Sequence, residues 1–239
     1  MRITCDTHTH TVASGHAYST VDEIAREAGE KKLEAVAITD HMTSMPGSPH
    51  IYHFYNLRVL PRKMYGVTVL RGAEANIMDE HGKVDVDHEV CENLDIVIAS
   101  FHPPTFIYST QEVHTQALLG AIANPLVQII GHPEDLRYEF DIPKVVKAAA
   151  DTGTVIEVNN SSLLPTSFRK GGHTQYVRIL KECRKQGVSI AIGSDAHIAD
   201  HVGRFSEALD LLIETSFPLE LVANTSLEKL CSHLSLNLT

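Results

Sequence analysis

The 239-residue sequence has no long hydrophobic run and no apolar segment near its N-terminus. A membrane-spanning helix needs about 20 consecutive apolar residues, and a secretory signal needs an apolar stretch early in the chain. Both are missing, because the chain opens on MRITCDTHTH and its apolar runs are short. These absences predict a soluble, cytoplasmic protein that does not bind membranes.

Basic residues are scarce relative to acidic ones. The chain has 20 Lys and Arg against 30 Asp and Glu, which gives a formal net charge of −10. Proteins that follow a nucleic-acid backbone carry a basic face. The charge therefore argues against long nucleic acid as a partner, although a small charged ligand can still bind locally.

Cysteine is also sparse, and its four positions show no C-x-x-C spacing. Cys5, Cys91, Cys183 and Cys231 are therefore predicted to be reduced thiols rather than a disulfide framework or a Cys-type zinc site. No low-complexity tract or composition break interrupts the chain, which is 43% hydrophobic and 21% charged. We expect one folded domain over residues 1–239.

Histidine, by contrast, is abundant, with 15 residues. A buried imidazole needs partners for its ring nitrogens, so histidine is costly as core filler. Three of these histidines crowd into the segment DTHTHTVASGH at residues 6–16. The excess favours a metal-binding hypothesis.

Short apolar runs rich in β-formers alternate with helical patterns along the whole chain, which predicts a parallel sheet covered by helices. Thr20 and Glu23 form a capping-box pattern, and DEHGK at 79–83 predicts a small hairpin after the third strand. The predicted strands are 3–8, 35–39, 67–75, 94–100, 127–131, 154–158 and 188–193. The predicted helices are 20–32, 54–63, 111–123, 143–151, 173–186 and 204–215.

Each predicted strand ends in residues of the types that bind metals. In a barrel these carboxyl ends converge on one face, whereas in an open sheet the outer strands lie too far apart to share a site. We therefore predict an α/β fold: a closed or nearly closed, distorted seven-stranded (β/α)7 TIM-like barrel with a metal site at the carboxyl ends. The residues at these ends are His8, His10, Asp40, His41, Glu74, His102, His132, Glu157, Asp195 and His197.

Spacing and neighbours select the candidate ligands. Residues two apart on a strand point the same way, and His residues followed by Pro, as in SFHPP and GHPED, are predicted to be extended at the strand end. The set is too large for one tetrahedral zinc and predicts three divalent ions bridged by Glu74, with Zn²⁺ favoured and Mn²⁺ or Fe²⁺ possible. The nine candidates are His8, His10, His16, His41, Glu74, His102, His132, Asp195 and His197.

The ordered motifs DTHTHTVASGHAYS, AITDH, GAEAN, ASFHPP, GHPED, EVNNSS and GSDAH resemble those of the polymerase and histidinol phosphatase (PHP) family. The resemblance is strongest to the small stand-alone bacterial phosphatases of that family and covers essentially the whole chain. It implies a distorted seven-stranded barrel that holds three zinc ions. The implied ligand groups are His8, His10, Glu74 and Asp195; Glu74, His102 and His132; and His16, His41 and His197.

Clustered divalent ions can polarise a phosphoryl group and lower the pKa of water. The leading hypothesis is therefore a phosphatase that hydrolyses small phosphomonoesters with a metal-activated hydroxide. Asp40 and Glu157 are predicted to orient ligand imidazoles. The candidate phosphate-binding residues, which follow the second and sixth strands, are Arg58, Arg62, Arg169 and Lys170.

Three alternatives remain open. The substrate could be histidinol phosphate. An amidohydrolase-type barrel also begins with H-x-H, but it carries a bridging Lys after its fourth strand, where this chain has ASFHPP. The third alternative is a non-catalytic metal-binding module. Specificity is expected to reside in segments 43–56 and 161–173, and an exposed apolar helix face could support a homo-oligomer.

Overall fold

The computed structural model describes residues 2–169 and 171–238. Its centre is a nearly closed barrel of 7 parallel strands, as the sequence predicts. Strand β3 (Lys63–Met64) lies outside this path and pairs antiparallel with β4. The strands follow the order β1 (Cys5–Asp6), β2 (Ala35–Ile38), β4 (Val67–Asn76), β5 (Ile96–Ser100), β6 (Ile129–Ile130), β7 (Val155–Asn159) and β8 (Ile190–Gly193).

The barrel closes through the segments that follow β1 and β8 rather than through the two strands themselves. The His10 N–H donates to the Ala196 carbonyl at 2.8 Å, and the Asp195 N–H donates to the His8 carbonyl at 2.9 Å. Asp6, at the end of β1, is fully buried and accepts from the Ser194 N–H at 3.0 Å. This seam therefore places the two ends of the sheet next to each other at the carboxyl face.

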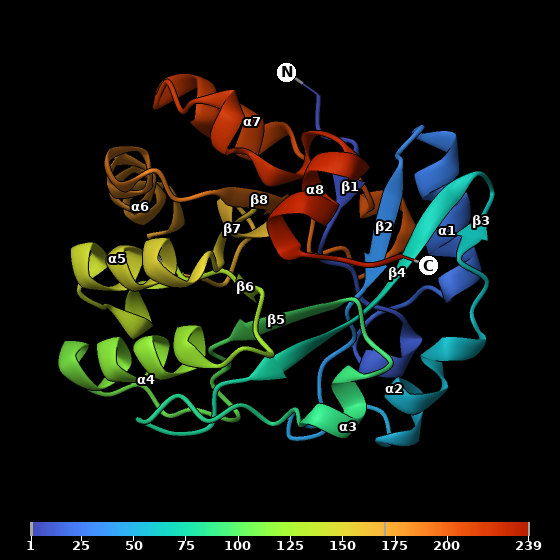
Figure 1. The fold of residues 1–239 in the computed structure, drawn as a ribbon, viewed down its shortest axis with the longest axis horizontal. Coiled ribbons are helices and arrows are strands. Elements are labelled where there is room, and N and C mark those ends of the chain that lie inside the picture. Colours follow the sequence, from blue (N-terminus) through green and yellow to red (C-terminus); the bar gives the residue numbers. More distant parts are fainter. Residues whose placement is uncertain (1, 170, 239) are drawn as a thin grey trace.

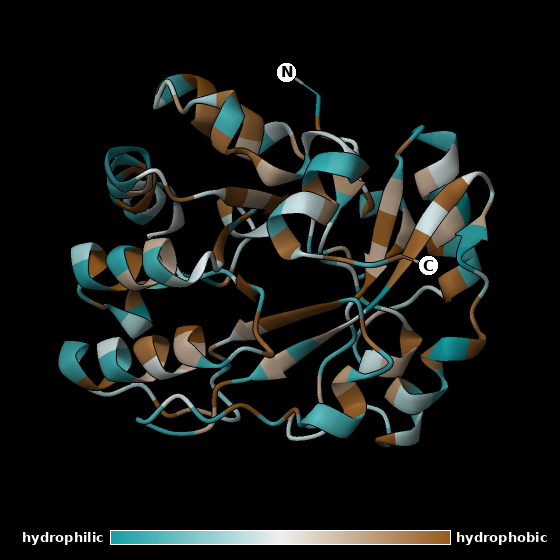
Figure 2. Cartoon of the chain, viewed as in Figure 1, coloured by the Kyte–Doolittle hydropathy of each residue, from teal (hydrophilic) through white to brown (hydrophobic). Residues whose placement is uncertain are grey.

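Helices surround the barrel (Figure 1). Figure 2 shows the strands largely in the hydrophobic colours, as expected for a sheet covered on its outer face. The helices are α1 (Val21–Glu30), α2 (Tyr52–Asn56), α3 (His88–Cys91), α4 (Gln111–Ala123), α5 (Ile142–Thr152), α6 (Gly172–Gln186), α7 (Ser206–Glu214) and α8 (Leu227–Leu234). Among the described residues, none of these helices is long and apolar enough to cross a bilayer.

Local signals explain most helix ends. The predicted capping box at Thr20 and Glu23 is confirmed at the start of α1. The prediction of one helix over 54–63 is wrong, because α2 passes into a 3₁₀ turn, Leu57–Val59, and ends there. Leu60 is extended, with φ −65° and ψ 132°, as expected for a residue that precedes a proline. The sequence did not predict α3 or α8.

Helix α8 packs on the interior of the barrel. Its Leu230 and Leu234 join a buried cluster with side chains of the strands, including Cys5, Leu70 and Ile129. A second, larger apolar cluster lies between the strands and the surrounding helices. The four cysteines are free thiols, as predicted. The packed interior leaves the carboxyl ends of the strands as the place where polar groups gather.

The predicted hairpin after the third parallel strand is confirmed. Ile77 and Val84 form an antiparallel bridge, and the Met78 N–H donates to the Lys83 carbonyl at 2.8 Å. The turn of this hairpin rests on α4 at Gly120, where the main chains approach so closely that a Cβ would overlap the His81 carbonyl oxygen. The absence of a side chain at Gly120 therefore permits the close packing of the hairpin on α4.

We expect Gly120→Ala to destabilise the protein, although alanine is ordinarily the better helix former by about 1 kcal/mol. The added methyl group displaces the hairpin, and such overpacking costs about 1–3 kcal/mol. Chemical denaturation measures the free energy of unfolding. Gln116, exposed on the same helix, supplies the control, because Gln116→Ala should be more stable than Gln116→Gly. A Gly120→Ala variant as stable as wild type would contradict the packing described.

Candidate metal centre

A buried carboxylate lies at the centre of the carboxyl face. Glu74, near the end of β4, is 1% exposed. Burial alone would raise the pKa of this carboxyl, but the imidazoles around it, with His102 and His8 foremost, hold its pKa well below the usual value. Its oxygens lie 2.8 Å from His41 Nδ1, 2.8 Å from His132 Nε2, 3.2 Å from His102 Nε2, 3.4 Å from His8 Nε2 and 3.5 Å from His10 Nε2.

The H-x-H pair lies beside this carboxylate. The Nε2 atoms of His8 and His10 are 3.1 Å apart, and both rings are fully buried. Asp195, which follows β8, places Oδ1 3.2 Å from His10 Nε2. Two imidazole nitrogens and two carboxylates therefore point at the same small volume across the seam of the barrel.

Glu157 on β7 determines which nitrogen of His8 faces that volume. Its Oε1 lies 2.7 Å from His8 Nδ1, which must donate because a carboxylate only accepts. In the neutral ring, Nε2 then carries a lone pair. Gly193 makes this contact possible, because a Cβ there would overlap the Glu157 carboxylate. Glu157 thus orients the imidazole of His8, one of the candidate ligands.

A second set of hydrogen bonds, here called a relay because it runs from one side chain to the next, orients His10. The Ser14 hydroxyl donates its one proton to Asp40 Oδ1 at 2.6 Å, so it accepts at 3.2 Å from His10 Nδ1. Asp40 acts on the imidazole through Ser14 rather than directly. Burial alone would raise the pKa of Asp40, but donors to it, first among them His53, lower its pKa to about 2. His10 Nε2 is therefore left with a lone pair directed at Glu74 and Asp195.

The third relay runs to the hairpin after β4. His102 Nδ1 donates to Asn76 Oδ1 at 2.7 Å, and the Asn76 side-chain amide donates to Asp85 at 2.7 Å. This chain fixes the amide orientation of Asn76 and leaves His102 Nε2 facing Glu74. The hairpin therefore supports the site through two hydrogen bonds in series.

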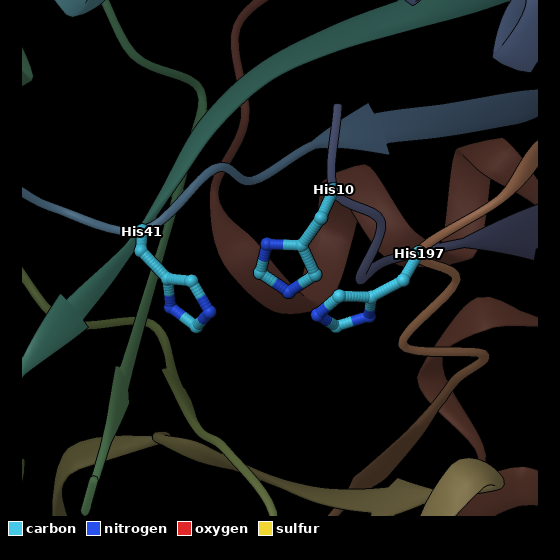
Figure 3. Close-up of side chains that lie close together, drawn as sticks. All are labelled: His10, His41 and His197. Atoms are coloured by element: carbon cyan, nitrogen blue, oxygen red, sulfur yellow. The ribbon is translucent and has the colours of Figure 1, made fainter. Parts of the chain in front are cut away.

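The rings of His41 and His197 lie next to His10, each with its centroid 4.4 Å from the His10 centroid. Figure 3 shows the rings of His10, His41 and His197 turned towards one another. His197 donates from Nδ1 to the Asp195 carbonyl at 2.9 Å, which leaves its Nε2 free. His16, which is exposed, has its ring centroid 5.1 Å from that of His41 and 4.9 Å from that of His197. The structure thus brings all nine predicted ligands together.

These residues fit divalent cations. His41 Nδ1, Glu74 Oε2 and His102 Nε2 are buried and lack a hydrogen-bond partner, which is costly unless another group satisfies them. Burial alone would lower the pKa of His8, but Glu157, Glu74 and Asp195 raise it well above the usual value, so the site attracts positive charge. A nitrogen-rich and sulfur-free set of donors suits zinc. Three groups of potential ligands overlap here: His10, His41 and His197; His8, His10 and Glu74; and His41, Glu74 and His102.

Two of the candidate ligands have unusual backbones. Asp195 has φ 55° and His132 has φ 26°, and such values cost a residue other than glycine about 1–3 kcal/mol. The prediction of an extended backbone at His132 is therefore wrong. Its N–H donates to Glu157 Oε2 at 2.7 Å while its Nε2 reaches Glu74, and these two contacts outweigh the local effect of the following proline.

The predicted phosphate-binding residues divide between the two ends of the barrel. Arg169 reaches the centre, where its Nη1 lies 3.1 Å from Asp195 Oδ2 and its side chain is 9% exposed. Arg62 instead pairs with Asp95 at 2.5 Å, just before β5, so it lies at the amino ends of the strands and its assignment needs correction. Arg58 is exposed on the 3₁₀ turn after α2, and no contact with the cluster is found within residues 2–169 and 171–238. Lys170 lies outside the described residues.

Sequence reasoning missed several supporting residues. Ser14 and Asn76 orient imidazoles, and Asn159 donates to Asp195 Oδ2 at 3.2 Å. Asn76 and Asn159 lie two residues after Glu74 and Glu157 on the same strands, so alternation along a strand could have placed them on the ligand-bearing face. Ser14 carries no comparable signal.

Comparison with known proteins gives one family. The profile of the PHP domain matches residues 6–161. A protein of Caldanaerobacter subterraneus subsp. tengcongensis named a probable phosphatase is 50% identical over 235 residues, which cover 98% of this chain and 92% of the relative. Another of that name, from Acetivibrio thermocellus, is 49% identical over 229 residues, or 96% of this chain and 94% of the relative.

Solved structures show the same fold. A histidinol phosphate phosphatase from Lactococcus lactis, complexed with zinc, L-histidinol and phosphate, matches with a TM-score of 0.65 at 18% identity. The match covers 91% of this chain and 95% of that one. At this level of identity, the likeness supports the barrel architecture alone.

We expect Glu157→Gln to weaken metal binding by about 10–100-fold, the usual effect of removing a group that orients a ligand. A glutamine offers one oxygen in place of two, so it cannot accept from both His8 Nδ1 and the His132 N–H. Competition with a chromogenic chelator measures the affinity. Glu112→Gln, which changes an exposed carboxylate on α4, is the matched control. Equal affinities in both variants would contradict the role given to Glu157.

Proposed function

Because the chain belongs to the PHP domain family, we propose that it is a metal-dependent phosphatase that hydrolyses small phosphomonoesters with three divalent ions, preferably Zn²⁺. Relatives that are about half identical along nearly the whole chain are named probable phosphatases. The observation that carries the proposal is the buried Glu74 carboxylate, which faces several imidazole nitrogens while its Oε2 lacks a hydrogen-bond donor. A single cation could not use all nine donors.

We assign the ions to three groups of residues that share Glu74 or its neighbours. The distances support Glu74 as a bridge, since its Oε1 faces His102 and His132 while its Oε2 faces His8 and His41. His41 is close both to Glu74 and His102 and to His197. The groups are His8, His10, Glu74 and Asp195; Glu74, His102 and His132; and His16, His41 and His197.

Divalent ions held there would polarise a phosphoryl group, offset its negative charge and lower the pKa of water. The chain itself contributes a dry, fixed arrangement of donors, because Glu157, Ser14 and Asn76 hold three of the imidazole rings. Arg169 lies beside Asp195 and can donate hydrogen bonds to a phosphate oxygen. The site therefore selects for a small dianionic group.

The proposal predicts that chelation abolishes phosphatase activity and that Zn²⁺ or Mn²⁺ restores it. Metal-ion stabilisation is worth several kcal/mol, so we expect a loss of at least about 100-fold in kcat. A panel of p-nitrophenyl phosphate, histidinol phosphate, and cyclic amides and lactones separates phosphatase from amidohydrolase activity. A metal-loaded protein that turns over none of these phosphates would support the non-catalytic alternative.

Glu74→Gln should lower both the number of bound metals and kcat, because an amide bridges two cations poorly. Elemental analysis and steady-state kinetics measure the two effects. Glu80→Gln, an exposed change at the tip of the hairpin, is the matched control. If Glu74→Gln kept full activity, or if wild type bound fewer than two metals per chain, the multinuclear centre would be wrong.

Arg169→Lys should raise the KM for a phosphomonoester by about tenfold with a smaller effect on kcat. Lysine keeps the charge but loses the planar fork, and a hydrogen bond to a charged group contributes about 1.5–3 kcal/mol. Arg184→Lys, on the exposed face of α6, should leave KM unchanged. An unchanged KM in Arg169→Lys would exclude a direct contact with the phosphate.

A further inference from the structure

His53 occupies an unusual position for a histidine outside the metal cluster. It lies in α2, a five-residue helix in the segment between β2 and β3, and its side chain is 23% exposed. Its Nε2 lies 3.1 Å from Asp40 Oδ2, whereas Asp40 itself is fully buried. His53 therefore joins a surface helix to a carboxylate inside the barrel.

The hydrogen bonds around Asp40 have a defined direction. Both oxygens of a carboxylate only accept, so His53 Nε2 carries the proton. The Thr11 N–H and the Ser14 hydroxyl donate to Oδ1 at 2.7 and 2.6 Å, and the Thr11 hydroxyl donates to Oδ2 at 2.8 Å. Of these donors, only His53 comes from a segment distant from Thr11 and Ser14. It thus ties Asp40 to a second segment of the chain.

The chain of hydrogen bonds continues from Asp40 through Ser14 to His10. The proton of Ser14 is committed to Asp40, so the Ser14 oxygen accepts from His10 Nδ1 and also from the His41 N–H, each at 3.2 Å. Rotation of the Asp40 carboxylate would release Ser14 to donate to His10 Nδ1 instead. That exchange would move the ring proton to Nε2, the atom that faces Glu74 and Asp195.

We propose that His53 is a positioning residue of the metal centre, which through Asp40 and Ser14 holds the His10 ring with its Nε2 lone pair directed at the metal cluster. The proposal rests on the proposed metal centre and does not depend on the identity of the substrate. His53 does not bind metal in this scheme, because its proton-bearing nitrogen faces Asp40. The segment that carries α2 is thereby coupled through Asp40 and Ser14 to His10.

The test compares two substitutions at one position. His53→Phe keeps a flat ring over Asp40 but removes the donor, whereas His53→Gln retains an N–H at a similar reach. We expect the affinity for Zn²⁺, measured by chelator competition, to fall about tenfold in His53→Phe and to stay within about threefold of wild type in His53→Gln. Equal affinities in wild type and His53→Phe would overturn the proposal, as would equal losses in both variants.

A second readout does not require metal or turnover. In metal-free protein labelled with ¹⁵N-histidine, long-range ¹H–¹⁵N spectra report which ring nitrogen of His10 bears the proton. We expect a proton held on Nδ1 in wild type and His53→Gln, and a changed pattern at His10 in His53→Phe. An unchanged His10 pattern in His53→Phe would overturn the relay even if wild type proved inactive on every phosphate.

Two controls locate the effect. His50→Phe removes an exposed histidine from the same segment, which contacts Tyr52 and should leave metal affinity unchanged. In an Asp40→Asn background, His53→Phe should cause no further loss, because the relay is already broken. Additive losses in the double variant would show that His53 acts by another route and would refute the role proposed here.

Discussion

The site is organised around one electrostatic constraint, the burial of Glu74 among imidazoles. A carboxylate removed from water needs compensating positive charge or hydrogen bonds, and the imidazoles around Glu74 supply part of this, since they hold its pKa well below the usual value. Glu157, Ser14 and Asn76 hold a ring proton of His8, His10 and His102 on the nitrogen that faces away from Glu74, so these three rings present Nε2 to the site. Glu74 Oε2 remains buried without a hydrogen-bond partner, and it is an atom that a cation would satisfy.

Much of the candidate site could be predicted from the sequence, because the carboxyl ends of all strands of a parallel barrel lie on the same face. Apolar runs that end in His, Asp or Glu must deliver those residues to one face. Five of the predicted imidazoles accordingly lie within 3.5 Å of a Glu74 oxygen, and the other predicted ligands lie beside those rings. The same rule explains why Glu157 could be recognised, since it lies on a strand whose register fixes its direction.

The failures occur where the chain leaves this regular pattern. Arg62 follows β2 in sequence, but the intervening turn has already carried the chain back to the amino ends of the strands, where Asp95 lies. His132 departs from the conformation that Pro133 favours, because its N–H and its ring are both engaged by carboxylates. Ser14 lies in a 3₁₀ turn and His53 in the five-residue helix α2, both in connections between strands, and contacts between such connections depend on tertiary geometry that no local spacing encodes.

The seam between β1 and β8 has a consequence for how the molecule holds together. His8 and His10 follow the first strand, whereas Asp195 and His197 follow the last, so both margins of the sheet contribute candidate ligands. His10 and Asp195, which face each other across the seam, would tie the beginning of the barrel to its end if they bound the same cation. Metal binding would then add to the few hydrogen bonds that join the two margins, so that occupancy of the site would be linked to the stability of the closed barrel.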